Sequence, residues 1–140
     1  MEVKLSSNEK KVRKATKKRG KALSKGIKKA LSITAQEGIN IIQARTSKGV
    51  GYKGGKFKPY DQKYAAFRTA RNRGTTPDLE FTGEMKGGMT SRANSKRAQI
   101  FFTRGEAAKK AAMNNKSRPF FGFSDRETDK LSKIFFRALK

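Results

Sequence analysis

Cysteine, histidine and tryptophan are all absent from the 140 residues of this chain. Without cysteine there is no disulfide framework, no thiolate zinc site and no thiol nucleophile. Without histidine, the usual general base near neutral pH and the commonest metal ligand are both missing. We therefore expect no catalytic residue, no metal and no cofactor, and a protein made in a reducing cytoplasm.

Acidic residues are also scarce, because 11 Asp and Glu face 35 Lys and Arg, which gives a formal net charge of +24. Like charges repel one another in a compact state, so a chain this basic is expected to meet a negatively charged partner. Nucleic acid is the first candidate, and an acidic protein surface is the second. A membrane surface ranks third, and no membrane partner is expected, since no stretch approaches the roughly 20 apolar residues of a spanning helix.

Apolar residues make up only 34% of the chain, and ten phenylalanines supply most of their bulk. A chain of this length forms one domain with a thin core. The expected organisation is a basic N-terminal extension at residues 1–21 and a single α+β domain at residues 22–140. The expected α+β fold has a long N-terminal helix, a small antiparallel sheet and a C-terminal amphipathic helix.

A long helix is predicted from about Ser24 or earlier to about Arg45, with one apolar and one basic face. Ser6 or Ser7 is a candidate cap for an earlier helical segment, although the composition of residues 1–30 also fits a disordered basic arm. The apolar face comprises Leu23, Ile27, Ala30, Leu31, Thr34, Ile41 and Ile42. The basic face comprises Lys18, Lys21, Lys25, Lys28 and Lys29.

Residues 46–64 contain four glycines and five lysines, which predicts a loop. Their spacing fits neither of the common phosphate-binding glycine patterns, so a loop that contacts a neighbouring chain or a DNA backbone is favoured. Tyr60, Tyr64, Ala65 and Phe67 predict a short helical segment that packs back on the domain, and residues 68–78 predict a polar linker. The candidate contact residues in the loop are Lys53, Lys56 and Lys58.

The second half of the chain predicts a β-hairpin and two helices. Ala98, Ile100 and Phe102 alternate with Arg97, Gln99 and Phe101, which is typical of a strand, and residues 92–96 are a suitable hairpin loop. Residues 105–113 are rich in alanine and predict a short helix. Ser124 and Glu127 form a capping-box pattern that opens the last helix, whose apolar face repeats at helical spacing.

Paired carboxylates are the candidates for hydrolytic catalysis. The acidic residues considered show no recognisable metal-ligand spacing, and those at the start of the last helix are explained by the helix dipole. Glu80 and Glu84 are the best candidates for a magnesium-dependent nuclease, which is the third-ranked function. The acidic residues considered are Asp61, Asp78, Glu80, Glu84, Glu106, Asp125, Glu127 and Asp129.

Two short motifs resemble those of a known family. The sequence L-x-F-T-G-x-M stands at residues 79–85, and R-P-F-F-G-F-S stands at residues 118–124, directly before the last helix. Together with the order of the predicted elements, they resemble the virion-morphogenesis and tail-completion proteins of long-tailed bacteriophages. The matching residues, to which a structural role is assigned, are Thr82, Gly83, Met85, Arg118, Pro119, Phe120, Phe121 and Gly122.

The resemblance implies a non-enzymatic structural protein of the head–tail junction of the virion, assembled in the host cytoplasm. Such a protein forms a homo-oligomeric ring, which is expected here to be a hexamer. Its partners are then other neck and tail proteins and double-stranded DNA, bound without sequence preference in the central channel. The alternative from a different class is a small basic protein that binds nucleic acid non-specifically on its own.

Overall fold

A single helix, α1 (Ser7–Ser47), dominates the computed structural model, which describes residues 7–79 and 83–140. Its 41 residues start well before Ser24, so the disordered-arm alternative is wrong for residues 7–21. Lysine, arginine and alanine have high intrinsic helix propensity, and α1 continues through Gly20 and Gly26. Ser6, one of the two candidate caps, lies outside the described residues.

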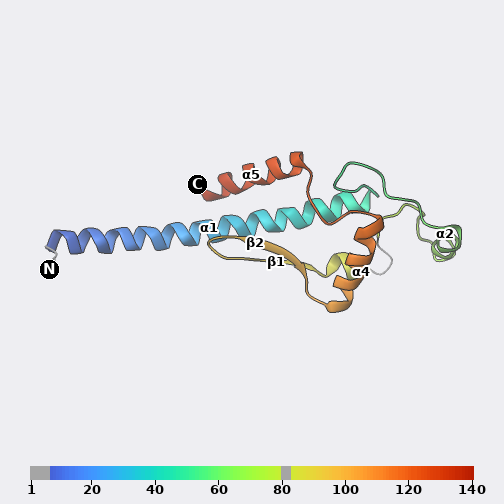
Figure 1. Cartoon of the computed structure of the whole chain (residues 1–140), viewed down its shortest axis with the longest axis horizontal. Helices are drawn as coiled ribbons and strands as arrows, with labels where there is room; N and C mark the ends of the chain where they lie inside the picture. The colour runs from blue at the N-terminus through green and yellow to red at the C-terminus, as the bar shows by residue number, and fades with distance from the viewer. Residues whose placement is uncertain (1–6, 80–82) are drawn as a thin grey trace.

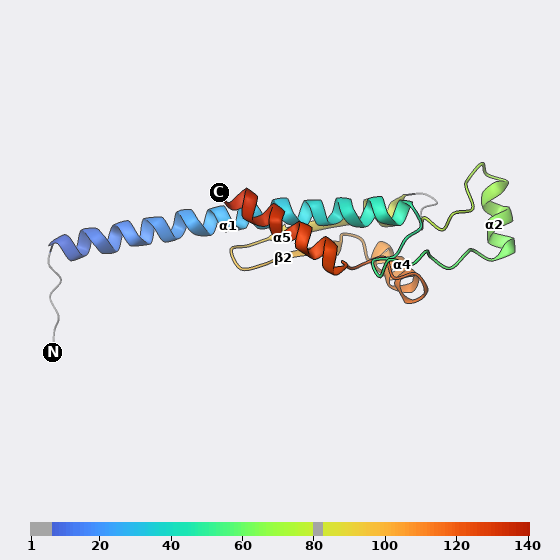
Figure 2. The ribbon, with the colours of Figure 1, turned by 90° about the horizontal axis from the view of Figure 1, so that it is seen from above.

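The C-terminal half of α1 is the scaffold on which the other elements pack (Figures 1 and 2). Helix α5 (Asp125–Leu139) lies alongside it and runs in the opposite direction, while a hairpin of β1 (Met89–Ala93) and β2 (Ala98–Phe102) packs on α1 as well. The N-terminal half of α1 extends beyond these elements by itself. The predicted α+β fold is confirmed.

The hairpin follows the predicted alternation. Its strands are antiparallel, with Met89 opposite Phe102 and Ala93 opposite Ala98. The side chain of Asn94 accepts hydrogen bonds from the backbone N–H groups of Lys96 and Arg97, which closes the turn. The residues at positions 98, 100 and 102 are half-buried and those at 99 and 101 are exposed, so the strand faces are oriented as expected.

Three further helices complete the fold: α2 (Gln62–Thr69), α3 (Glu84–Gly87) and α4 (Gly105–Ser117). The last confirms the predicted alanine-rich helix and extends it by one turn. The prediction that the segment of α2 packs back on the domain is wrong. Helix α2 lies at the far end of the molecule, beyond the C-terminus of α1 (Figure 1). It is held mainly by its own flanking loops, into which Arg68 is buried.

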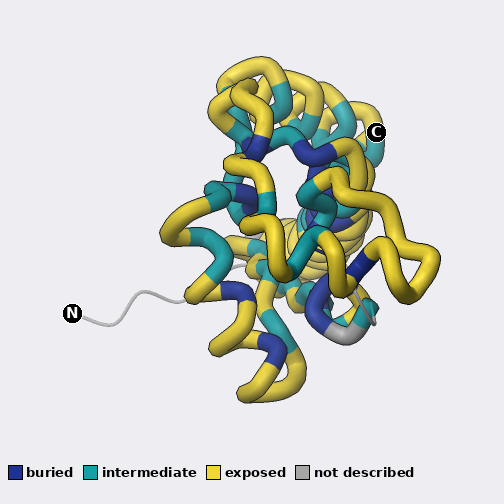
Figure 3. The backbone as a smooth tube through the Cα atoms, turned by 90° about the vertical axis from the view of Figure 1, so that its right-hand side faces the viewer, coloured by how far each residue is buried: buried dark blue, intermediate teal, exposed yellow. Residues whose placement is uncertain are grey.

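A small core lies between α1, the hairpin and residues 118–123, and most of the surface around it is exposed (Figure 3). Phe120 is the largest apolar side chain with no exposed surface. On α1 the predicted apolar face is only partly correct: Ala30 and Ile42 are buried, but Leu23 is 59% exposed because it precedes the packed half. The core cluster comprises Ile39, Ile42, Phe57, Leu79, Met85, Met89, Ala111 and Phe120.

Candidate nucleic-acid and assembly interface

All the charged side chains at residues 10–29, on the projecting part of α1, are positive. Residues 10–29 contain eleven Lys and Arg and no Asp or Glu, and all eleven are exposed. Helical rise of about 1.5 Å per residue makes this segment about 30 Å long. We call it the basic arm, and it includes the five predicted lysines. Its charged residues are Lys10, Lys11, Arg13, Lys14, Lys17, Lys18, Arg19, Lys21, Lys25, Lys28 and Lys29.

The second group of predicted contact lysines lies far from the basic arm. Lys53, Lys56 and Lys58 are exposed on the loop that follows α1, and about 28 Å of helix separates Lys29 from the end of α1. The loop is folded back by hydrogen bonds from the N–H of Gly51 to the carbonyl of Gly55 and from the N–H of Gly54 to the carbonyl of Gly51, and it is anchored by buried Phe57. The two lysine groups are therefore separate surfaces, joined by one helix.

The R-P-F-F-G-F-S motif forms the junction between α4, the loop and α5. Arg118 donates hydrogen bonds to the backbone carbonyls of Lys58 and Pro59, and its guanidinium lies over the ring of Tyr60. The side chain of Asn115 accepts hydrogen bonds from the backbone N–H groups of Phe120 and Phe121. Since Pro119 cannot continue a helix, the segment stays extended and Phe120 enters the core.

Gly122 is required by close packing. A Cβ atom at this position would lie 2.8 Å from the ring of Tyr52, which is shorter than any ordinary contact. The backbone N–H of Tyr52 also donates a hydrogen bond to the carbonyl of Pro119. The motif therefore holds the glycine-rich loop against the start of α5.

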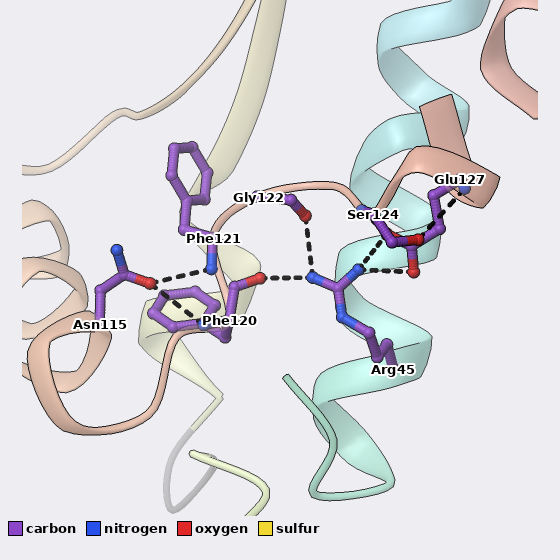
Figure 4. A network of polar contacts seen from close by, with 7 residues as sticks. All are labelled: Arg45, Asn115, Phe120, Phe121, Gly122, Ser124 and Glu127. Carbon is purple, nitrogen blue, oxygen red and sulfur yellow. Dashed lines mark hydrogen bonds and ion pairs between the residues drawn. The ribbon is translucent and has the colours of Figure 1, made fainter. Parts of the chain in front are cut away.

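Arg45 connects this motif to the last helix (Figure 4). Its Nη1 donates to both carboxylate oxygens of Glu127, at 2.7 and 2.6 Å, and its Nη2 donates to the carbonyls of Phe120 and Gly122, at 2.6 and 2.9 Å. Glu127 also completes the predicted capping box with Ser124. We call this group the Arg45 junction, and it joins α1, the motif and α5.

The carboxyl group of Glu127 is held in its charged form. Burial alone would raise its pKa, but the hydrogen bonds from Arg45 and Ser124 outweigh burial and lower the pKa below the ordinary value of 4.5. Because the folded state lowers this pKa, the stabilisation is complete above about pH 4.5 and is lost as the pH falls through the folded-state pKa.

We therefore expect the Glu127→Gln variant to be less stable than the parent at about pH 7, and the difference to narrow by about pH 3. Urea unfolding followed by circular dichroism at both pH values measures this. Asp129→Asn is the matched control, because Asp129 is exposed on the same helix. A gap of equal size at both pH values would contradict the assignment.

The L-x-F-T-G-x-M motif contributes to the core, through positions 79 and 85, rather than to a surface. Gly83 has a positive φ of 81°, a conformation that favours glycine, and it precedes α3. Met85 is buried in the core cluster, where its sulfur lies 3.7 Å from the side-chain nitrogen of Asn114. Thr82 lies outside the described residues.

The carboxylates give no support to the nuclease alternative within the described part of the chain. No group of three or more acidic side chains gathers there that would hold a metal ion. Asp61 caps α2, Asp78 pairs with Arg68 at 3.1 Å, and Glu127 belongs to the Arg45 junction. Glu80 and the side chain of Glu84 lie outside the described residues.

Three structural residues were not identified from the sequence. Arg45 was expected only as a helix end, Asn115 follows the predicted helix of residues 105–113, and Arg68 was assigned to a polar linker although it is 1% exposed. Burial by itself lowers the pKa of Arg68, but Asp78 outweighs it through a hydrogen bond and its charge, so the pKa is raised. No local pattern signals these roles, because the partners are distant or lie in irregular backbone.

Within residues 7–79 and 83–140, none of the helices combines the length and apolar character needed to cross a membrane. Comparison of the whole chain with family models, curated proteins and solved structures gives no significant match.

Proposed function

We propose that this chain is a non-enzymatic structural protein of the bacteriophage neck, which forms a ring at the tail end and helps to join tail and head around DNA. One observation carries the proposal: the basic arm projects about 30 Å with eleven exposed positive charges and no acidic residue. A surface of this kind neutralises phosphates by displacing counterions, which gives affinity without sequence preference.

The arrangement of the domain supports assembly into a ring. No residue of α5 is fully buried, and Phe136 on this helix is 62% exposed. A thin core with exposed apolar surface gains stability when a neighbouring subunit covers it. In a cyclic ring each contact joins two different patches of the subunit, so the α5 side of one copy would meet another side of the next.

The motif that resembles the tail-completion family supports the same assignment. Residues 118–122 position α5 through the Arg45 junction and hold the glycine-rich loop in place. The structural role expected for these residues agrees with their contacts. In the proposed neck, copies of this chain sit at the head–tail junction of the virion beside other neck and tail proteins.

A second candidate function is non-specific nucleic-acid binding by the chain on its own. The basic arm favours it equally, since a single exposed helix needs no ring to contact phosphates. The two candidates differ in the state of assembly, and an experiment on DNA binding and assembly together separates them.

The test uses a triple variant, Lys21→Gln, Lys25→Gln and Lys28→Gln. We expect this variant to fold normally and to bind duplex DNA more weakly regardless of sequence. The slope of log affinity against log salt concentration should become shallower by about three, since each lost phosphate contact reduces it by about one. The triple variant Lys96→Gln, Lys109→Gln and Lys116→Gln removes the same charge from exposed positions that are not candidate contacts, and it is the control. Equal losses of affinity in both variants would show that net charge alone binds DNA.

Assembly is measured on the same samples by sedimentation velocity and negative-stain electron microscopy. The neck proposal expects closed rings of about six copies, and the control variant should retain them. Particles that stay monomeric on DNA at all concentrations would replace the neck proposal with the second candidate. Normal DNA affinity of the arm variant would contradict both.

A further inference from the structure

The basic arm has a second side on which apolar residues gather around a single basic residue, Arg19. Val12, Thr16, Arg19, Leu23 and Ile27 follow one another at intervals of three or four residues, so they share one side of the helix. Val12 is 65% exposed and Leu23 is 59% exposed. The hydroxyl of Thr16 donates to the carbonyl of Val12 and needs no external partner. We call these five residues the arm stripe.

The arm stripe continues the face of α1 on which α5 packs. From Ile27 the same spacing leads through Ala30 and Thr34 to Glu37 and then through Ile41 to Arg45. Glu37 pairs with Lys130 of α5 at 3.7 Å, and Arg45 pairs with Glu127 of α5. One face of α1 thus holds a helix along its packed half, and the same face is uncovered where α5 ends (Figures 1 and 2).

The glycines of α1 also differ between the half of the helix that is packed and the half that is uncovered. A Cβ atom on Gly38 would meet Phe123 at 2.9 Å and Ile100 at 3.0 Å, so this glycine makes room for packed side chains. Gly20 precedes it by five helical turns and points to the same side, yet a Cβ there, as on Gly26, would meet nothing within 4 Å. Both glycines weaken the helix relative to alanine, and no contact within the described chain requires them.

We propose that the arm stripe is a docking surface for an amphipathic helix of a different protein, whose apolar face is flanked by acidic residues. The continuity with the α5 interface indicates a helical partner, and Gly20 and Gly26 permit close approach of its backbone. The sign of the flanking charge follows from Arg19, which lies within the stripe, and from the complete absence of acidic residues at positions 10–29.

Charge disfavours a second copy of this arm as the occupant. A symmetric antiparallel pair centred between Val12 and Ile27 brings Arg19 close to its own counterpart, within about one Debye length, roughly 10 Å at 0.1 M salt, and the rest of each arm is positively charged as well. An acidic helix replaces this repulsion by attraction. Duplex DNA presents mainly charged and polar groups, which suit the lysine side of the arm better than Val12 or Leu23.

The inference does not depend on ring formation, and its test uses the full chain. The probes are three fluorescent helical peptides with leucines on one face and glutamates beside them, which differ only in register. A scrambled peptide of identical composition, in which the leucines no longer share a face, is the control. We expect at least one designed peptide to bind at least about tenfold more tightly than the scrambled one in fluorescence anisotropy.

Two variants locate the binding. Leu23→Gln should weaken the designed peptide by about tenfold or more, whereas Met113→Gln, at a residue 72% exposed on α4, should leave it unchanged. Gly20→Leu should raise helicity at 222 nm and yet weaken the peptide, because the new side chain occupies the approach path. Loss of binding with a gain of helicity distinguishes docking from damage to the fold.

The remaining outcomes overturn the proposal. Equal binding of designed and scrambled peptides would show charge attraction without a docking surface. Self-association abolished by Leu23→Gln in the absence of peptide would make a second copy the occupant. Leu23-dependent binding to vesicles of phosphatidylserine and phosphatidylcholine, without peptide binding, would make the stripe a membrane contact.

Discussion

Replacing Arg45 by methionine is expected to lower the free energy of unfolding by about 3 kcal/mol, the low end of the range for a broken buried ion pair. The guanidinium side chain is 10% exposed and binds one carboxylate and two backbone carbonyls. Its removal leaves the charge of Glu127 and the carbonyls of Phe120 and Gly122 without their donor.

Unfolding in guanidinium chloride at about pH 7 measures this loss of stability, and Arg126→Met is the matched control. Arg126 is exposed on α5 next to Glu127, so its loss should change stability by less than about 0.5 kcal/mol. The double variant Arg45→Met with Glu127→Gln should be less destabilised than the sum of the two single variants, since the buried charge is removed with its partner. Additive effects would show that the two residues act independently.

Phe120→Ala is expected to have the largest effect of any single substitution considered, about 3–5 kcal/mol. Its side chain is fully buried in the core cluster, and alanine would leave a cavity between α1, the hairpin and α4. The backbone contacts of residue 120 with Arg45 and Asn115 persist in the variant, because they use its carbonyl and its N–H. The loss therefore reports packing alone.

Phe136→Ala provides the comparison within the same chain, because this phenylalanine is 62% exposed on α5. We expect it to cost less than about 1 kcal/mol in the isolated monomer. Thermal unfolding at equal concentration compares the two variants, and similar midpoints would mean that Phe120 is not the centre of the core.

Features set by neighbouring residues were predictable from the sequence. The capping box of Ser124 and Glu127 and the alternation of Ala98, Ile100 and Phe102 both depend on spacing within a few residues, and both are confirmed. Phe120, for which the family resemblance implies a structural role, is buried in the core.

Features set by distant residues were not predictable. The guanidinium of Arg45 reaches partners 75 and 82 positions later in the chain, which no periodicity reveals. Arg68 is buried because Asp78 and the carbonyl of Gly74 meet it across an irregular loop. The exposure of Leu23 depends on where α5 ends, which the helical pattern of α1 does not contain.

The unbroken course of α1 has a consequence for the folding of its exposed half. Five lysine pairs spaced four residues apart repel one another in residues 10–29, each by about 0.2–0.5 kcal/mol, and two glycines weaken the segment further. Such a helix does not nucleate alone in water, so its first turn must be supplied by the packed residues that follow. The arm is thus a helix propagated outward from the domain, and any polyanion that neutralises its lysines also stabilises its helical form.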